Sequence, residues 1–204
     1  SQFGAKLKFE KGLNIVYGPN SLGKTRIVTG IIYALGGEKG LGIFKKKQNP
    51  FKPEFYDSIE GEKISYSVVI LEISNGKKTV CLIRSIINKT DVVGLKECSL
   101  AEFESTSKIE YLKALGDGVM LKGGLQYFLY DFLNIPIIEV PTFDGSTSKI
   151  YFENILPLFF VEQRAGWSQI QARQVTRYGI RDIKKVAFEF TLGLDKIESH
   201  VLEI

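Results

Sequence analysis

The spacing of apolar residues along the chain predicts its first elements. Apolar residues alternate with lysines over 6–9, as on a half-buried strand, and 13–17 is a nearly continuous apolar run that predicts a mostly buried strand. Over 27–35 the apolar residues recur every three to four positions, as on the buried face of a helix. Gly36-Gly37 predicts where this helix ends, because glycine tolerates the left-handed conformation at helix C-termini.

A β-hairpin is the clearest prediction in the middle of the chain. After a long loop predicted over 38–62, two runs rich in β-forming residues cover 64–73 and 79–87. Between them lies Asn75-Gly76, a pair that favours a tight turn between antiparallel strands. We therefore expect an antiparallel lobe in this region.

The second half predicts a mixture of short elements. Ser107 and Glu110 have the spacing of a capping box, which predicts that a helix starts here. A second helix is predicted over 125–133, and the apolar runs 137–140 and 158–162 predict short buried strands.

Near the C-terminus, seven apolar residues are spaced alternately by four and three, as in a coiled-coil seam. They are Ile183, Ala187, Phe190, Leu194, Ile197, Val201 and Ile204. Gly193 weakens the pattern, and the alternative for its first part is a core-facing helix. We interpret 1–180 as one unit and 181–204 as a helix leading into a coiled coil, and we expect the sequence to be half of a longer protein.

The segment between the strand at 13–17 and the helix at 27–35 predicts chemistry. It fits the phosphate-loop pattern G-x-x-x-x-G-K-[ST] with Gly18, Pro19, Asn20, Ser21, Leu22, Gly23, Lys24 and Thr25, followed by Arg26. Its glycines let backbone N–H groups turn toward an anion, and the helix N-terminus adds its positive end. Lys24 is predicted to reach the β- and γ-phosphates, and the Thr25 hydroxyl to bind Mg²⁺. We expect ATP with Mg²⁺ as the ligand.

Composition narrows the class of protein further. The chain has 204 residues, 44% of them apolar and 25% charged, as in an ordinary globular domain. No apolar run approaches the roughly 20 residues of a membrane helix. The sequence shows no signal pattern, and two cysteines are too few for a disulfide framework, so we expect a cytoplasmic protein with no membrane partner. Residues 1–56 hold ten Lys/Arg and three Asp/Glu, a net charge of +7, which fits a surface that meets phosphates and equally fits a solvated basic loop.

Two other classes of phosphate-loop protein fit less well. Asn88-Lys89-Thr90-Asp91 matches the N-K-x-D pattern by which GTPases read guanine. A GTPase also needs D-x-x-G between the two motifs, but the only aspartate there is Asp57, and position 60 is Glu. A nucleotide kinase usually carries several arginines in its lid and acceptor site, and arginine is sparse here before Arg164.

A family resemblance favours a third class. Residues 14–25 resemble the start of ABC-type ATPase heads of the SMC and RecF/RecN kind, in which A-L-G-G often closes the next helix, as 34–37 does here. Residues 156–167 are similar to the Q-loop region of a bacterial branch of such heads, SMC-like ATPases of anti-phage systems of the Lamassu type. The predicted lobe resembles their β-lobe, and the heptad seam resembles the start of their coiled-coil arm.

The resemblance implies a fold and site roles. The fold is α/β, the N-terminal half of a P-loop NTPase head of the ABC type, with an antiparallel β-lobe and the start of an arm. Gln163 would complete the Mg²⁺ shell and help to place the attacking water, and Asn20 would lie near the γ-phosphate. The family's LSGGQ signature and its Walker B motif, an apolar strand ending in Asp-Glu, do not occur in this sequence. In the family both lie in the C-terminal half, so we expect an ATPase as a full-length protein and near-inactivity for this part alone.

The resemblance also implies partners. Such heads form a homodimer that sandwiches ATP, they need the C-terminal half of the same head, and they act on DNA in genome defence or repair, with accessory or nuclease subunits. The alternative is a non-catalytic, nucleotide-gated assembly module. A candidate DNA surface combines lysines with aromatic residues: Phe44, Lys45, Lys46, Lys47, Phe51, Lys52, Phe55 and Tyr56. A solvated loop is the alternative for that segment.

Overall fold

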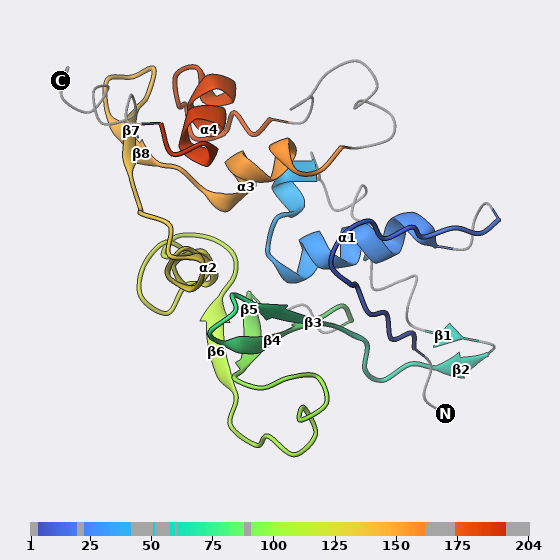
Figure 1. Ribbon diagram of the computed structural model, residues 1–204. Coiled ribbons are helices and arrows are strands. Elements are labelled where there is room, and N and C mark those ends of the chain that lie inside the picture. Colours follow the sequence, from blue (N-terminus) through green and yellow to red (C-terminus); the bar gives the residue numbers. More distant parts are fainter. Residues whose placement is uncertain are drawn as a thin grey trace.

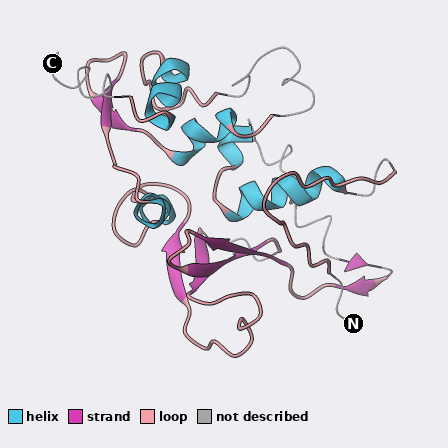
Figure 2. Ribbon diagram, in the orientation of Figure 1, coloured by secondary structure: helices cyan, strands magenta, loops and turns pink. Residues whose placement is uncertain are grey.

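The computed structural model describes residues 4–19, 23–41, 51, 58–59, 61–87, 91–161 and 174–194. Within them, a four-stranded antiparallel sheet carries two helices on one face, and a further layer of helices with a short hairpin lies beyond those helices (Figure 1). Figure 2 shows the division clearly, with the longest strands gathered at one end of the molecule and short helices at the other.

The first helix, α1, spans Lys24–Ala34 and packs on strands β3 and β4. It ends where the glycine pair predicts, and Gly36 adopts φ +71°. Gly36 N–H donates to the Tyr33 carbonyl, and Gly37 N–H donates to the Ile32 carbonyl at 2.9 Å. These two bonds form a Schellman motif, which satisfies carbonyls that the helix end leaves unpaired. A short 3₁₀ helix, η1 (Glu38–Leu41), follows at once.

The sheet has the order β3-β4-β5-β6, and all of its pairs are antiparallel. Its strands are β3 (Val68–Ser74), β4 (Thr79–Ser85), β5 (Val92–Lys96) and β6 (Glu110–Lys113). The predicted hairpin and antiparallel lobe are confirmed, although the first strand begins at Val68 rather than at 64. Asn75 fixes the turn, because its Oδ1 accepts hydrogen bonds from the amides of Lys77 and Lys78 at 2.9 and 2.8 Å. A separate two-stranded ladder joins β1 (Ser58–Ile59) to β2 (Glu62–Lys63).

The helix predicted at Ser107 and Glu110 is wrong. Glu110 begins strand β6 and pairs with Leu95 of β5. Leu112, two residues later, is 2% exposed and joins the core under the sheet. A capping box acts only within one turn of chain, and here the pairing with a distant strand and the burial of Leu112 outweigh it.

Helix α2 spans Leu125–Leu133, the bounds that the sequence predicts. Its residues Leu125 and Leu129 are buried in one cluster with Leu82 and Val93 of the sheet. Asn134 ends the helix in the left-handed conformation, with φ 54°. Helix α2 therefore extends the layer that α1 begins.

A second core lies in the outer layer. Its elements are the hairpin of β7 (Glu139–Pro141) and β8 (Thr147–Lys149), the helix α3 (Phe152–Ile155), the 3₁₀ helix η4 (Leu156–Leu158) and the helix α4 (Ile183–Thr191). Its buried members include Tyr130, Val140, Ile150, Ile155, Ile180 and Ile183. The short buried strand predicted at 137–140 is only partly confirmed, since β7 begins two residues later.

Two predictions for the C-terminal third change. The strand predicted at 158–162 is wrong in its described part, because Leu158 ends η4 while Phe159 and Val161 are largely exposed. Helix α4 buries Ile183 and Ala187 in the molecule, which fits the core-facing alternative for the start of the heptad seam. Residues 195–204 of that seam lie outside the described residues, so the coiled coil stays a prediction.

The N-terminal segment 4–19 differs most from its prediction, because the structure assigns no strand to it. Leu13, Ile15 and Tyr17 are 87%, 73% and 90% exposed, so the prediction of a mostly buried strand is wrong. A strand needs a neighbour for its backbone groups and its apolar side chains, and no described strand pairs with this segment. Asn14 folds the segment back locally, since its Oδ1 accepts from Glu10 N–H at 2.9 Å.

Candidate phosphate-binding site

The predicted phosphate loop leads directly into α1. Gly18, Pro19, Gly23, Lys24 and Thr25 are described, while residues 20–22, which include Asn20, Ser21 and Leu22, lie outside the described part. Gly23 is the N-cap of α1 and adopts φ +80° and ψ 13°. This left-handed conformation suits glycine, because a side chain there costs about 1–2 kcal/mol. The second glycine of the motif therefore stands where the backbone turns into the helix.

Lys24 is the first residue of α1, and its side chain folds back over the loop. Its Nζ donates hydrogen bonds to the carbonyl oxygens of Gly18 and Pro19, both at 2.6 Å. The ammonium group is thus held at the loop by two neutral acceptors. An incoming phosphate offers charged oxygens instead, with which an ammonium group forms stronger hydrogen bonds.

The start of α1 is suited to an anion. The amides of Lys24 and Thr25 belong to the first helical turn, whose N–H groups have no acceptors within the helix. No acidic residue lies in this turn, so the positive end of the helix dipole is not neutralised by the helix itself. Thr25 and Arg26 are exposed. Backbone amides, dipole and Lys24 therefore meet at one accessible point.

The residues present fit Mg²⁺ as well as phosphate. The Thr25 carbonyl accepts from Thr29 Oγ1 at 2.9 Å, whereas the Thr25 side chain is left exposed next to the loop. A hydroxyl oxygen is a hard ligand of the kind that Mg²⁺ prefers, with phosphate oxygens and water supplying the others. Among the described residues, no group of three or more His, Cys, Asp or Glu side chains forms a separate metal centre.

A buried ion pair that the sequence analysis missed supports the far end of α1. Arg84 of β4 places Nη2 2.6 Å from Glu38 Oε1, with side chains only 4% and 14% exposed. The same guanidinium donates to the Tyr33 carbonyl and lies 4.0 Å from the centre of the Tyr33 ring. Burial raises the pKa of Tyr33, which Arg84 partly offsets, and the Tyr33 hydroxyl donates to the Ser85 carbonyl at 2.7 Å.

One sequence signal does point toward this pair. Arg84 follows Val80 and Leu82 at every second position of β4, and both of those residues are buried. An arginine in the inward phase of a strand predicts a buried partner, because an unpaired buried charge is costly. Nothing in the sequence identifies that partner as Glu38.

Several other predicted residues cannot be placed at the site. Gln163 lies outside the described residues, and so do the four lysines of the candidate DNA surface. Phe51, which belongs to that surface, is 5% exposed and lies 4.8 Å from Tyr33 between ring centres, so it is not free to stack on a base. Of the GTPase-like motif only Asp91 is described, and its carbonyl accepts from Ala114 N–H at 2.7 Å.

Comparison with known proteins gives one family. The sequence profile described as AAA domain matches residues 3–163, which covers the loop, α1, the whole sheet and α3. No curated protein matches the chain, and no solved structure does. None of the helices in the described part of the chain has the length and apolar character needed to cross a membrane.

Proposed function

Because the chain belongs to the AAA domain family, a P-loop ATPase family found in SMC-like proteins, we propose that it is the ATP-binding half of an SMC-like ATPase head. One observation carries the proposal. The motif lysine, Lys24, starts α1 and reaches back to the loop carbonyls at 2.6 Å, at a helix end that holds no acidic residue. A phosphate chain is the ligand that uses all of these groups together.

In this proposal each group of the motif, together with Gln163, has a definite task in nucleotide binding. The backbone from Gly18 to Thr25 would hold the β-phosphate, and Lys24 would turn from the loop carbonyls to the β- and γ-phosphate oxygens. Thr25 would hold Mg²⁺, which neutralises the phosphates when it is bound. Gln163, by resemblance, would complete the Mg²⁺ shell. Lys24 and Thr25 would thus bind and orient the phosphates, and a general base would come from another part of the head.

The exposed N-terminal run supports the proposal that a second half-head completes the fold. Leu13, Ile15 and Tyr17 point large apolar side chains outward directly before the phosphate loop. A segment that lies outside any sheet can become a strand when a neighbour pairs with its backbone, and burial of these side chains would stabilise that contact. We propose that the C-terminal half of the head supplies this neighbour together with the Walker B glutamate.

Action on DNA is part of the same proposal. Two completed heads would close around two ATP molecules, and hydrolysis would open them, so that ATP drives movement of the arms on DNA in genome defence or repair. Accessory or nuclease subunits would then use the remodelled DNA. These roles depend on the resemblance to SMC-like heads rather than on the site itself.

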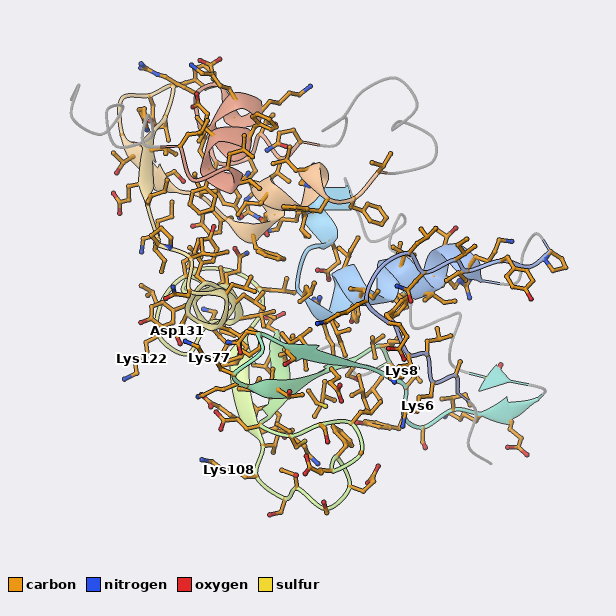
Figure 3. All side chains as sticks on the ribbon, in the orientation of Figure 1. Lys6, Lys8, Lys77, Lys108, Lys122 and Asp131 are labelled. Atoms are coloured by element: carbon orange, nitrogen blue, oxygen red, sulfur yellow. The ribbon has the colours of Figure 1, made fainter. Side chains whose placement is uncertain are left out.

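Calorimetry tests nucleotide binding directly. ATP, a non-hydrolysable ATP analogue and GTP are titrated with Mg²⁺ into the chain and into Lys24→Ala. Lys122→Ala is the matched control, since Lys122 is an exposed lysine far from the start of α1 (Figure 3). We expect ATP preference, a loss of affinity of roughly ten-fold or more in Lys24→Ala, consistent with the loss of a charged hydrogen bond, and no change in Lys122→Ala. Preference for GTP, or equal affinity in Lys24→Ala, would contradict the proposal.

Turnover tests the half-head. The chain alone is expected to hydrolyse ATP barely, and addition of the C-terminal half of the head should raise the rate. Binding without any gain on mixing would leave an assembly module gated by nucleotide as the better account.

A further inference from the structure

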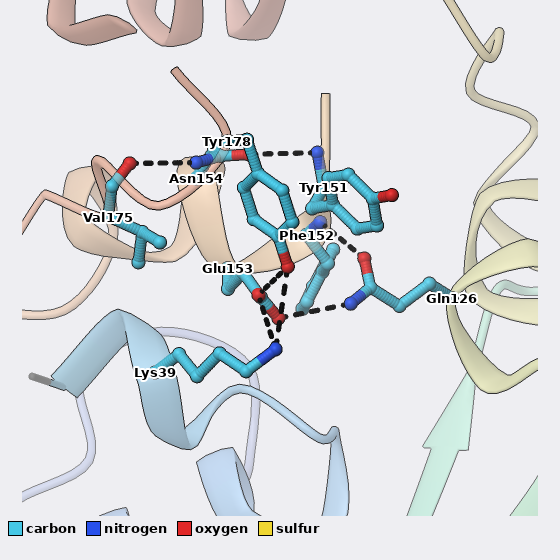
Figure 4. Close-up of polar contacts among 8 residues, drawn as sticks. All are labelled: Lys39, Gln126, Tyr151, Phe152, Glu153, Asn154, Val175 and Tyr178. Carbon is cyan, nitrogen blue, oxygen red and sulfur yellow. Dashed lines mark hydrogen bonds and ion pairs between the residues drawn. The ribbon is translucent and has the colours of Figure 1, made fainter. Parts of the chain in front are cut away.

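Glu153 of α3 lies at the centre of a polar cluster that joins three elements, α3, η1 and α2, to the turn that carries Tyr178 (Figure 4). Its side chain is 2% exposed. Oε1 lies 3.2 Å from Lys39 Nζ of η1 and accepts a hydrogen bond from the Tyr178 hydroxyl. Oε2 accepts from Gln126 Nε2 of α2 at 3.1 Å. Both oxygens of the carboxylate are therefore engaged.

Each hydrogen bond around the Glu153 carboxylate has a matching donor and acceptor. Gln126 donates through Nε2 to Glu153, and its Oε1 accepts from Phe152 N–H at 2.8 Å. In the described part of the chain, Lys39 is the one cation paired with the Glu153 carboxylate. The Glu153 side chain is only 2% exposed, and a buried charge with a single ionic partner depends strongly on that partner, because solvent stabilises it little.

On one side the cluster is tied to the phosphate-loop helix. Lys39 follows the end of α1 by five residues, across the tight Schellman turn at Gly36. Its neighbour Glu38 pairs with Arg84 of the sheet. Glu38 thus attaches the end of α1 to the sheet, and Lys39 attaches it to the outer layer. Restricting the motion of α1 therefore also restricts both of these contacts.

On the other side the cluster is tied to α4. The Tyr178 ring stacks on Tyr151 with centres 4.0 Å apart and planes 7° apart. One residue later, the Gly179 carbonyl accepts from Phe143 N–H at 2.9 Å, and Ile180 enters the core that α4 shares. The same stretch is held once more by α3, since Asn154 Nδ2 donates to the Val175 carbonyl at 3.2 Å.

We propose that Glu153 is a positioning residue that couples nucleotide binding at the start of α1 to the stability of α4, through Lys39 and Tyr178. The inference rests on the proposed function, since it needs a nucleotide at the phosphate loop. Local opening of α4 pulls on the segment that carries Tyr178, and this contact holds only while Lys39 keeps Glu153 in place. A ligand that restricts α1 also restricts Lys39, and it therefore makes opening of α4 less frequent.

A matched pair of tyrosine variants isolates the contact. Tyr178→Phe removes the hydroxyl that binds Glu153 and keeps the stacked ring. Tyr151→Phe makes the same chemical change in the partner ring, whose hydroxyl points away from Glu153 in Figure 4. A purely structural effect of losing a hydroxyl from this stack would appear in both variants, whereas a coupling effect would appear only in Tyr178→Phe.

A second set of variants exchanges the charge with its neighbour. In Glu153→Gln, the new Nε2 faces Gln126 Nε2, and rotating either amide leaves one donor or acceptor unmatched. Adding Gln126→Glu restores every hydrogen bond, because Glu at 126 accepts from both Gln at 153 and Phe152 N–H, while Gln at 153 still accepts from Lys39 and Tyr178. The single variant should lose the coupling, and the double variant should recover it.

Hydrogen–deuterium exchange of the amides of residues 183–191 measures the coupling, with and without saturating ATP and Mg²⁺. We expect ATP to slow exchange of α4 about five-fold or more in the wild type and in Tyr151→Phe, near the lower end of usual coupling factors. In Tyr178→Phe and Glu153→Gln the slowing should fall below about two-fold, while calorimetry still detects ATP binding.

The outcomes separate the inference from the function on which it rests. If the wild type binds no ATP, the proposed function fails and the inference fails with it. If the wild type binds ATP but α4 exchange does not respond, or if Tyr178→Phe responds as fully as Tyr151→Phe, the inference alone is overturned.

Discussion

Removal of the arginine from the buried pair under α1 should be one of the most costly single changes to this fold. Arg84→Met leaves Glu38 as an unpaired carboxylate with a side chain that is 14% exposed, and it takes the guanidinium from the Tyr33 carbonyl. Breaking a buried ion pair by removing one partner typically costs about 3–5 kcal/mol. Total stabilities of domains lie at roughly 5–15 kcal/mol, so this loss is a large fraction of the whole.

The stability losses of a second variant and a control show whether the cost comes from the unpaired charge or from lost packing. Methionine keeps most of the apolar volume, so the cost should come mainly from Glu38. The double variant Arg84→Met/Glu38→Gln should then recover most of it, because an uncharged side chain remains. Lys78→Met on the same hairpin is the matched control. Its pair with Glu97 spans 3.8 Å with side chains 68% and 69% exposed, and such surface pairs contribute at most about 1 kcal/mol.

Urea unfolding at neutral pH, followed by far-UV circular dichroism, gives the free energy of unfolding for all four proteins. The reasoning is refuted if Arg84→Met loses no more stability than Lys78→Met. It is also refuted if the double variant is as unstable as the single one, since the cost would then not come from the unpaired carboxylate.

Two further predictions concern titrating groups. Burial, with smaller contributions from Cys98, raises the pKa of Cys81 to about 12. Burial is the largest cause and remains in a Cys98→Ser variant, so the Cys81 thiol should still resist a thiol reagent at pH 8 until the protein unfolds. Labelling of the native protein at a rate independent of denaturant would contradict this. Hydrogen bonds from Thr142 and Ser146 lower the pKa of Asp144 to about 2. Because the folded-state pKa lies below the unfolded-state pKa of about 4, Asp144 stabilises the fold above about pH 4, and this stabilisation is lost as the pH falls toward 2. The urea midpoints of wild type and Asp144→Asn should therefore converge between about pH 4 and pH 2, and a constant difference would contradict the assignment.

Local signals in the sequence are enough to predict α1, the Asn75-Gly76 hairpin and α2. Each of these depends on residues close together in the chain: a glycine pair after an apolar periodicity, a turn pair between strands, and an amphipathic stretch before a proline. The capping box at Ser107 misled for the same reason, since β6 forms by pairing with β5, a contact that no local pattern contains.

The candidate site likewise combines residues that a local motif predicts with contacts between residues far apart in the sequence. The motif identified Lys24 and Thr25, and its spacing placed Gly23 at the turn into the helix, because phosphate binding requires those residue types within eight positions. The pairs Glu38–Arg84 and Lys39–Glu153 join residues 46 and 114 positions apart. Only the folded chain brings these partners together: the phase of β4 marks Arg84 as buried, but nothing in the sequence pairs it with Glu38 or pairs Lys39 with Glu153.

The outward-facing side chains of Leu13, Ile15 and Tyr17 have a practical consequence for anyone who handles this chain alone. Large apolar side chains exposed together favour association, so molecules in a concentrated sample should adhere to one another through this segment. Light scattering should rise with protein concentration, and titration curves recorded at high concentration would include this self-association. Dilute samples, or samples with a peptide that covers the segment, should give titration curves without this self-association.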